Sequence, residues 1–313
     1  MARNRLHIIC GNASRDLAQS VCRHLGQTLG NAEVDRFADG EVFVQVEDNV
    51  RGVDLFIVQS THPPAEHIME LLMLIDACRR SSAARITAVI PYFAYARADR
   101  KDQPRVAITA KLLANLIVGA GADRVLTVDL HSPQIQGFFD IPLDHLYAAP
   151  VLMRYFETLK LKEDVVVVSP DAGAVKIGRA FAKRLGVDLA IVDKRRTRHD
   201  EVELMHIIGE VEGRNCIILD DLISTGGTIC QAAVGLKKRG AQRVIACATH
   251  GVFSGNAFAQ LEAAPVDEVA FTNTLPLAAK NVPSKFHELD ISKLLSKAIL
   301  NIHHEESVSS LFI

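Results

Sequence analysis

One stretch of the chain joins two acidic residues to a run of small and hydroxylated ones. The apolar residues 216–219 predict a buried strand, and Asp220 and Asp221 follow at its carboxyl end, the edge where open α/β sheets bind ligands. An apolar helical pattern follows after Ser224, Thr225, Gly226, Gly227 and Thr228. Backbone N–H groups and hydroxyls at the start of a helix can close around a phosphate. The two carboxylates beside them suit sugar hydroxyls.

Two other interpretations of this segment remain open. The first is an ordinary strand end followed by a tight turn at Gly226 and Gly227. The second is a Walker B strand, which is disfavoured because the chain contains no G-x-x-x-x-G-K-[ST] segment. A dinucleotide-binding fingerprint is absent as well, since Gly119 and Gly121 end a helical pattern instead of following a strand.

Cationic residues gather in two further segments. Lys194 and Arg196 follow a predicted strand at residues 189–192, and Arg97 begins a stretch of nine residues that holds four arginines and lysines. Taken alone, either segment is typical of a solvated loop. Next to a phosphate, the same guanidinium and ammonium groups bind the anion or stack on a base.

Carboxylates and one histidine complete the set of candidate residues. Asp39, Gly40 and Glu41 predict a β-turn with a carboxylate on each side of the glycine. His131 and Asp171 each come just after a predicted strand. Carboxylate oxygen is the ligand that Mg²⁺ prefers, whereas imidazole is not, so His131 alone is more typical of a hydrogen-bonded structural residue.

The elements that must position these residues follow an alternating pattern. Short β-branched runs alternate with helical patterns such as residues 64–80, which predicts βαβ units and mainly parallel sheets. The predicted strands are residues 6–10, 54–58, 85–90, 124–128, 165–168, 189–192, 216–219 and 243–248. Pro142 and Pro150 interrupt the rhythm between residues 140 and 155, so we expect the connection between two α/β domains there. Residues 284–302 predict a last strand, turn and helix.

Bulk composition narrows the class of protein. A length of 313 residues favours two domains. The formal net charge of −2 provides no electrostatic reason to bind nucleic acid or a membrane surface. The six cysteines form no C-x-x-C pair, which argues against a zinc site and a disulfide framework. No signal peptide and no stretch of 18 uncharged apolar residues is present, so we expect a soluble, cytoplasmic protein.

Segments along nearly the whole chain resemble the ribose-phosphate pyrophosphokinase family, in the family's order. The matching segments are residues 37–41, 59–61, 91–97, 129–131, 169–173, 193–196 and 216–228. The resemblance implies an α/β fold with two phosphoribosyltransferase-type domains, each with a mainly parallel sheet flanked by helices. We expect these domains at residues 1–147 (the ATP side) and 148–286 (with the ribose 5-phosphate loop). The C-terminal segment 287–313 is expected to pack back on the first domain.

The resemblance also implies an activity and a set of roles. The reaction transfers the pyrophosphoryl group of ATP to the anomeric hydroxyl of ribose 5-phosphate, giving phosphoribosyl pyrophosphate and AMP for nucleotide biosynthesis. ATP is expected at Asp39, Gly40, Glu41, Arg97 and Ala98. Ribose 5-phosphate is expected at Arg196, Asp220, Asp221, Ser224, Thr225, Gly226, Gly227 and Thr228. Lys194 and Arg196 are the expected catalytic residues, His131 and Asp171 the expected Mg²⁺ contacts, and a homohexamer the expected assembly.

The chain departs from the family's pattern at several positions. Ala98 stands where Gln is common, Ser224 where Asp is common, Ala174 where Gly is usual and Asn49 where Ser is usual. The family's allosteric phosphate or ADP site would draw on Arg51, residues 79–82, residues 307–309 and Phe312. Three alternatives remain: a catalytically silent regulatory relative, a phosphoribosyltransferase and a pure nucleotide-binding module. A phosphoribosyltransferase would need a base-binding hood, and the sequence shows no segment that predicts one.

Overall fold

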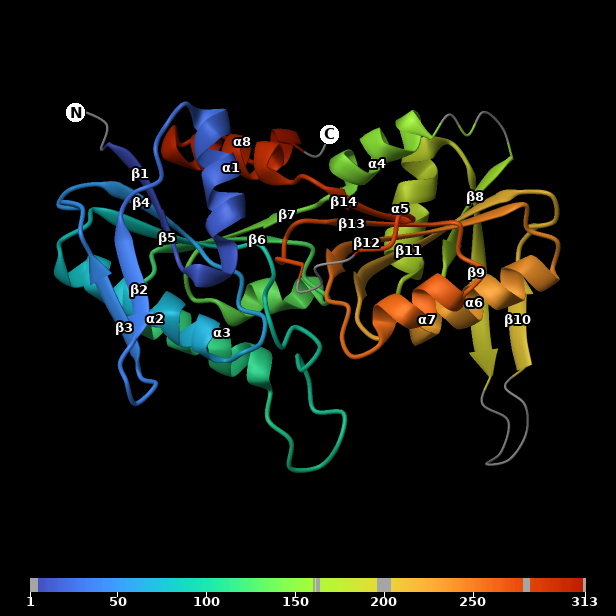
Figure 1. The fold of residues 1–313 in the computed structure, drawn as a ribbon, viewed down its shortest axis with the longest axis horizontal. Coiled ribbons are helices and arrows are strands. Elements are labelled where there is room, and N and C mark those ends of the chain that lie inside the picture. The colour runs from blue at the N-terminus through green and yellow to red at the C-terminus, as the bar shows by residue number, and fades with distance from the viewer. Residues whose placement is uncertain (1–4, 160, 162–163, 196–203, 278–281, 312–313) are drawn as a thin grey trace. The chain divides into compact units, whose positions relative to one another are not determined.

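The computed structural model describes residues 5–159, 161, 164–195, 204–277 and 282–311. The described chain divides into two compact units, each built around its own sheet (Figure 1). Unit 1 comprises the described parts of Met1–Ala148, Thr274–Pro276 and Ile291–Ile313. Unit 2 comprises the described parts of Ala149–Asn273 and Leu277–Asp290.

Unit 1 contains a parallel sheet of five strands in the order β1-β4-β5-β6-β7. The strands are β1 (Leu6–Cys10), β4 (Asp54–Val58), β5 (Arg85–Ile90), β6 (Arg124–Val128) and β7 (Leu143–Leu146). The helices α2 (Glu66–Arg80) and α3 (Thr109–Ala120) cover one face, and α1 (Arg15–Leu25) and α8 (Ser292–His303) pack together on the other (Figure 1). Because helices cover both faces, every residue of β4 is buried.

A β-hairpin stands beside this sheet and was not predicted. It pairs β2 (Ala32–Arg36) with β3 (Val42–Val46) in antiparallel register, and β3 packs on α2. Val34, Val44 and Val46 are only partly buried against the core, so the hairpin shows a weak apolar pattern. Its turn carries residues 37–41.

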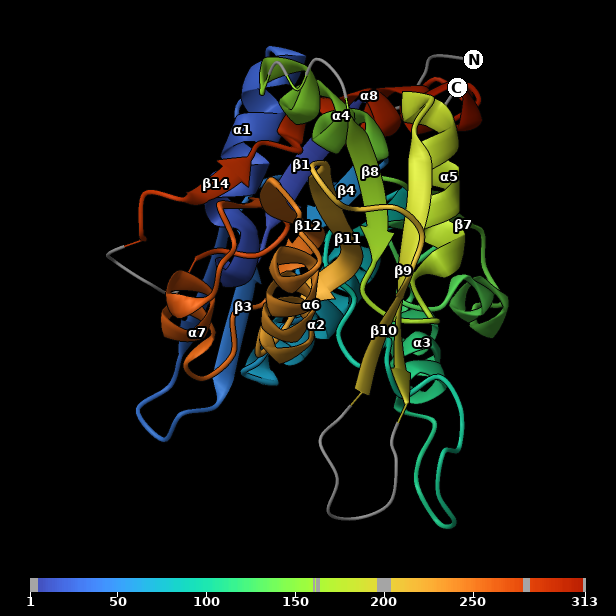
Figure 2. The same cartoon turned by 90° about the vertical axis from the view of Figure 1, so that its right-hand side faces the viewer.

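Unit 2 contains a sheet of seven strands in the order β10-β9-β8-β11-β12-β13-β14, in which only the β9 and β10 pair is antiparallel. The strands are β8 (Val165–Ser169), β9 (Asp188–Arg195), β10 (Leu204–Ile208), β11 (Asn215–Ile223), β12 (Arg243–Gly251), β13 (Glu268–Thr272) and β14 (Phe286–Leu289). One face is covered by α6 (Gly227–Lys238) and α7 (Ala257–Ala263), which lie side by side (Figure 2). The other face is covered by α4 (Ala149–Thr158) and α5 (Val175–Leu185).

Alternation along the strands of unit 2 sorts the core into two layers. Val166 and Val168 join the core beneath α6 and α7, whereas Val167 joins the core beneath α4 and α5. Successive side chains of a strand point to opposite faces, so a strand that is apolar throughout needs helices on both sides. The predicted α/β class, with mainly parallel sheets flanked by helices, is confirmed.

Several boundaries differ from the sequence-based expectations. The segment 140–155 is more than a connection, because it holds β7 and the start of α4. The expected C-terminal segment 287–313 is divided: β14 pairs with β13 in unit 2, whereas α8 lies in unit 1. β11 continues to Ile223, so Asp220 and Asp221 lie within the strand.

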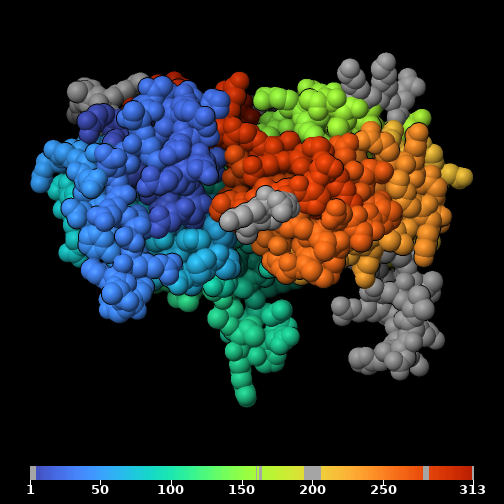
Figure 3. All heavy atoms as spheres, viewed as in Figure 1, coloured from blue at the N-terminus to red at the C-terminus, as the bar shows by residue number. Residues whose placement is uncertain are grey.

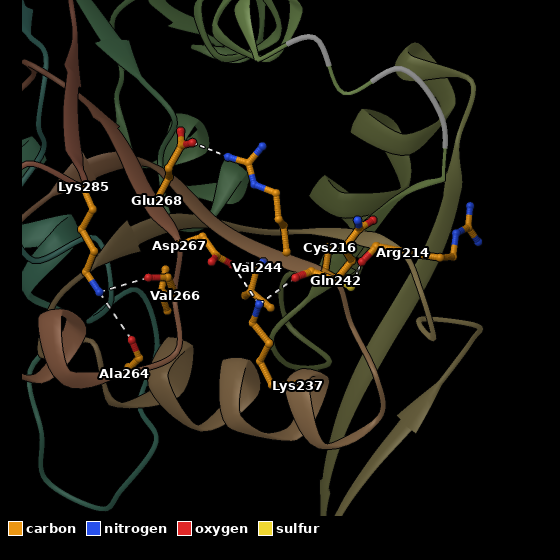
Figure 4. Close-up of polar contacts among 11 residues, drawn as sticks. Arg214, Cys216, Lys237, Gln242, Val244, Ala264, Val266, Asp267, Glu268 and Lys285 are labelled. Atoms are coloured by element: carbon orange, nitrogen blue, oxygen red, sulfur yellow. Dashed lines mark hydrogen bonds and ion pairs between the residues drawn. The ribbon is translucent and has the colours of Figure 1, made fainter.

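Two lysines bind acceptor groups near the starts of β12, β13 and β14 in unit 2 (Figure 4). Lys285 Nζ donates to the carbonyls of Val266 and Ala264, at 3.0 and 3.4 Å. Lys237 Nζ lies 3.0 Å from Asp267 Oδ2 and 2.8 Å from the Gln242 carbonyl. These contacts join α6, α7 and the sheet at the edge opposite the carboxyl ends of the parallel strands.

All six cysteines are free, and all except Cys230 are buried, which confirms that they are core or helix thiols. Among the described residues, no helix has both the length and the apolar character needed to cross a membrane.

Candidate functional site

Asp220 and Asp221 lie on the part of β11 that extends beyond its neighbour β8. The pairing of β11 with β8 ends at Ile218, whereas its pairing with β12 continues through Asp220 to Ile223. On the β8 side, the extended part of β11 therefore borders the loop that follows β8. Asp221 is buried and Asp220 half-buried, and the Asp221 N–H donates to Asp220 Oδ1 at 2.9 Å.

Asp171 lies in that loop and organises the entry into α5. Its Oδ1 accepts hydrogen bonds from the N–H groups of Gly173 at 2.8 Å and Ala174 at 3.0 Å. The Ser169 hydroxyl donates to the Asp171 carbonyl at 2.7 Å. The Asp171 side chain is exposed, and its Oδ2 accepts no hydrogen bond from the residues that the structure describes. That oxygen is available to a ligand.

The three carboxylates crowd one another. Burial raises the pKa of the Asp220 carboxyl well above its ordinary value, and the charges of Asp221 and Asp171 raise it further, although the Asp221 N–H opposes the shift. The loop after β8 and the extended end of β11 bring these carboxylates to the same edge of the sheet. A cation bound there would relieve this repulsion.

The predicted anion cradle, residues 224–228, comprises the loop after β11 and the first two residues of α6. Gly226 caps α6 with φ +80°, and no side chain caps the helix. A Cβ on Gly226 would lie 3.0 Å from Leu261 Cγ of α7, so a larger residue would press on Leu261 in addition to the strain at positive φ. The first turn of α6 has no acidic residue, which leaves its N–H groups and the positive end of its dipole for an anion.

The described part of unit 2 offers few protein ligands for a metal, and this suits Mg²⁺. Among the residues that the structure describes, no three His, Cys, Asp or Glu side chains are arranged to hold a metal together. Mg²⁺ commonly takes only one or two carboxylates and completes its shell with phosphate oxygens and water. Asp171 lies at the same edge of the sheet as Asp220, and its Oδ2 accepts no hydrogen bond from the described residues, so it is suited to that arrangement.

In unit 1, Asp39, Gly40 and Glu41 form the turn of the β2–β3 hairpin. The turn is held by the Gly40 N–H, which donates to the Phe37 carbonyl, and by the Glu41 N–H, which donates to Asp39 Oδ1 at 3.1 Å. Gly40 has φ +95°. Both carboxylates are exposed, and the Phe37 ring beside them is 55% exposed. No role for Phe37 was predicted from the sequence, although an aromatic residue in a polar turn is a signal for one.

Arg97 and Ala98 lie in the loop between β5 and α3, part of which forms a teal projection in Figure 3. The Arg97 side chain is exposed. The Ala98 N–H donates to the Tyr95 carbonyl at 2.8 Å, and its carbonyl accepts from the Ala110 N–H at 3.2 Å. Ala98 thus anchors the loop to α3, and its N–H is already engaged within the chain.

His131 follows β6 in unit 1 with an exposed side chain. The turn before it is tightly held, because the Leu130 N–H donates to His145 Nε2 at 2.9 Å and Asp129 Oδ2 accepts from the Ala148 N–H at 2.8 Å. The predicted role of His131 at a metal stays a prediction.

Lys194 lies on the backbone of β9, opposite Met205 of β10. Arg196, the second predicted catalytic residue, lies outside the described residues. The predicted meeting of the unit 1 residues with the carboxylates and cradle of unit 2 also stays a prediction.

A buried polar network joins Gln59, at the end of β4, to Glu70 of α2, and the sequence did not predict it. Gln59 Nε2 donates to Glu70 Oε2 at 2.7 Å, and the same oxygen accepts from the Asn12 N–H at 3.0 Å. Gln59 Oε1 accepts from the Ala13 N–H at 3.2 Å. The network ties the loop after β1 to the end of β4. A glutamate in an amphipathic helix is normally solvated, so the sequence held no signal for Glu70.

Two family models match the chain. Residues 6–121 match the N-terminal domain of ribose phosphate pyrophosphokinase, and residues 194–313 match a phosphoribosyl synthetase-associated domain.

Individual proteins match over almost the full chain. A ribose-phosphate pyrophosphokinase of Agrobacterium fabrum is 53% identical over 98% of this chain and 100% of its own length. One from Neisseria meningitidis is 51% identical over 99% of this chain and 96% of its own length. The crystal structure of phosphoribosylpyrophosphate synthetase from Mycobacterium smegmatis matches with a TM-score of 0.91 and 42% identity, covering 96% of this chain and 100% of that one.

Proposed function

The chain belongs to the ribose-phosphate pyrophosphokinase family of enzymes, and from this premise we propose its substrates, its metal and the roles of its residues. The reaction transfers the pyrophosphoryl group of ATP to the anomeric hydroxyl of ribose 5-phosphate. Phosphoribosyl pyrophosphate, a precursor for nucleotide biosynthesis, and AMP are the products.

One observation carries the proposal: the strand that holds a pair of acidic residues leads, through a short loop, into a helix N-terminus without a side-chain cap. The N-terminus of α6 has no capping side chain, and Asp220 and Asp221 precede it on β11. A phosphate bound by the helix N-terminus and a diol bound by carboxylates are the two ends of ribose 5-phosphate. A nucleobase or an amino acid does not combine these features.

Ribose 5-phosphate accordingly binds in unit 2. Its phosphate accepts hydrogen bonds from the backbone and hydroxyl groups of residues 224–228. Its hydroxyls donate to Asp220 and Asp221. Ser224, which stands where the family commonly has Asp, places a neutral hydroxyl in this loop, so the loop carries less negative charge toward the phosphate. Arg196 adds a cation on the phosphate side of the sugar.

ATP binds to the turn and loop of unit 1. Asp39 and Glu41 are exposed carboxylates that can accept from the adenine amino group, and the exposed Phe37 ring offers a flat apolar surface for the base. Arg97 pairs with the polyphosphate. Ala98 acts by anchoring Arg97, because its backbone groups bond to Tyr95 and Ala110.

Mg²⁺ is the proposed metal, with Asp171 as its carboxylate ligand and His131 as a contact from unit 1. Bound with the nucleotide, the ion would neutralise polyphosphate charge. Asp171 is suited to this role because its Oδ1 keeps the turn before α5 in place while Oδ2 remains available.

The anomeric oxygen attacks the β-phosphorus, a new oxygen–phosphorus bond forms, and the bond to the oxygen of AMP breaks. The hydroxyl proton passes to solvent. Positioning and charge stabilisation account for most of the acceleration in phosphoryl transfer. Lys194 and Arg196 stabilise the charge that develops on the bridging and equatorial oxygens.

A cytoplasmic location and assembly into a homohexamer belong to the same proposal. Six free cysteines suit a reducing compartment. The exposed Leu112 and Leu116, one turn apart on α3, suit contact with another subunit. Light scattering of the purified protein would check the assembly.

The test is incubation of the purified protein with ATP, Mg²⁺ and ribose 5-phosphate, followed by chromatography of the nucleotides. AMP that forms only when the sugar is present supports the proposal. Lys194→Ala should lower the rate by about 10²–10³. Lys238→Ala, at an exposed lysine on the last turn of α6, should leave it unchanged.

Other products point to the alternatives. ADP in place of AMP indicates a different kinase. No turnover, with nucleotide still bound, indicates the silent regulatory relative. Consumption of phosphoribosyl pyrophosphate with a nucleobase indicates a phosphoribosyltransferase.

A further inference from the structure

Three residues after β12 form a short strap, Val252 to Ser254, against the end of β11. The N–H groups of Val252 and Phe253 both donate to the Ile223 carbonyl, at 3.0 Å each. The Ser254 N–H donates to the Ser224 carbonyl at 3.0 Å. The strap therefore holds the last residue of β11 and the first residue of the cradle.

Holding these carbonyls also orients the N–H groups that follow them. In a planar trans peptide the N–H points opposite to the C=O. Because the carbonyls of Ile223 and Ser224 point at the strap, the N–H groups of Ser224 and Thr225 point away from it. Neither N–H has a protein acceptor among the described residues, so both are available to an anion.

Phe253 has an unfavourable backbone conformation within the strap. Its φ is +45°, in the left-handed region that residues with a Cβ rarely adopt. The ring is buried and compensates through aromatic contacts, with centroids 4.6 Å from Phe258, 4.8 Å from Phe271 and 5.7 Å from Phe286.

The Phe253 ring lies close against the backbone of β12 at Gly251. A Cβ on Gly251 would lie 2.5 Å from Phe253 Cε2 and 2.7 Å from Phe271 Cδ2. The Phe253 ring therefore packs directly on the Gly251 backbone. Any residue with a Cβ at position 251 would clash with the ring. The Ser254 hydroxyl contributes little, because it is 3.5 Å from the Ser224 hydroxyl.

We propose that Phe253 is a positioning residue for ribose 5-phosphate: its buried ring holds the strap, and the strap aims the Ser224 and Thr225 N–H groups at the phosphate. This inference rests on the proposed function of the cradle. Phe253 acts through the backbone and touches no reacting atom. Its influence falls on sugar phosphate binding and leaves ATP binding alone.

The test compares Phe253→Leu with Phe258→Leu. Both changes remove one ring from the same aromatic cluster, but only Phe253 belongs to the strap. We expect Phe253→Leu to raise KM for ribose 5-phosphate about tenfold with KM for ATP unchanged, and Phe258→Leu to change neither by more than about twofold. Calorimetry with ribose 5-phosphate alone should show the same weakening. Hydrogen exchange at the strap amides should be faster only in Phe253→Leu.

The proposal is overturned if the two variants weaken ribose 5-phosphate binding equally, or if Phe253→Leu changes neither binding nor amide exchange. Phe253→Met replaces Phe253→Leu if the latter does not fold. Calorimetry and exchange need no turnover. If the parent protein binds ribose 5-phosphate but forms no AMP, the proposed function fails while the comparison still tests Phe253. A parent that does not bind the sugar phosphate overturns both.

Discussion

His303 Nδ1 lies 2.6 Å from Asp54 Oδ2, which joins the end of α8 to the start of β4 across 249 residues of sequence. Arg85 completes the contact: its Nε and Nη2 bind both oxygens of Asp54 at 2.7 and 2.6 Å, and Nη2 also donates to the Ile302 carbonyl at 3.0 Å. Asp54 is buried, and this hydrogen bonding raises the pKa of Arg85. One carboxylate thus holds the C-terminal helix on unit 1.

Asp54→Asn should therefore destabilise unit 1. The change removes the negative charge that Arg85 faces, and we expect a loss of about 2 kcal/mol in the free energy of unfolding, below the full buried-pair range because Arg85 is partly exposed. Denaturant unfolding measures it. Asp76→Asn, at the exposed pair with Arg80 on α2, is the control and should leave the midpoint unchanged. Equal effects of the two changes would contradict a buried clamp.

Asp171→Asn should separate metal binding from folding. Asparagine keeps an Oδ1 that accepts from Gly173 and Ala174, so the turn before α5 survives, but the ligand charge is lost. We expect the Mg²⁺ concentration for half-maximal activity to rise at least about tenfold, with little change in Tm. Asp171→Ala should lose the turn as well, with about 1 kcal/mol of stability. An unchanged Mg²⁺ requirement in Asp171→Asn would exclude Asp171 as a ligand.

Asp220→Asn should stabilise the protein while lowering its activity. Burial, with the charges of Asp221 and Asp171, raises the pKa of Asp220, so the folded state favours the protonated carboxyl. Such a group contributes stability at pH below its unfolded pKa, and that contribution is lost as pH rises through the folded value. The gain in Tm of Asp220→Asn over the parent should therefore grow from acidic to mildly alkaline pH. If the increase in Tm were the same at every pH, the ionised Asp220 carboxylate would not destabilise the folded protein.

Gly226→Ala should disturb the cradle more than Gly227→Ala does. Gly226 has φ +80°, and its added Cβ would meet Leu261, so we expect a loss of about 1–2 kcal/mol in stability and weaker binding of ribose 5-phosphate. Gly227 begins α6, and a Cβ there would make only an ordinary contact at 3.8 Å with Thr225 Oγ1. Gly227→Ala should unfold no earlier than the parent in thermal unfolding. The reverse order of Tm values would refute the role given to Gly226.

Some elements of the described chain could be predicted from short stretches of sequence, and others could not. β1, β4, β5 and β6 were predicted residue for residue, because strands covered on both faces are continuous apolar runs in any context. The cradle was predicted for a similar reason: a helix start preceded by small residues is a local property.

Hairpin β2–β3 and strands β7, β10 and β13 were not predicted. The hairpin is partly buried and pairs only with itself, so its pattern resembles that of a loop. β7 lies beside prolines that suggested a connection. β7 and β10 lie at the edges of their sheets, each beside the strand that precedes it in sequence. Edge strands lack the continuous apolar run that marks a strand covered on both faces.

The sequence by itself determined the fold class, the carboxylates of β11 and the glycines of the cradle, because composition and spacing within a few residues specify them. Only the tertiary structure decided that the loop of Asp171 borders the extended end of β11, that the Phe253 N–H donates to the Ile223 carbonyl and that His303 reaches Asp54. Each of these contacts joins residues on separate elements. Their energies depend on distance and burial, which exist only once the chain has folded.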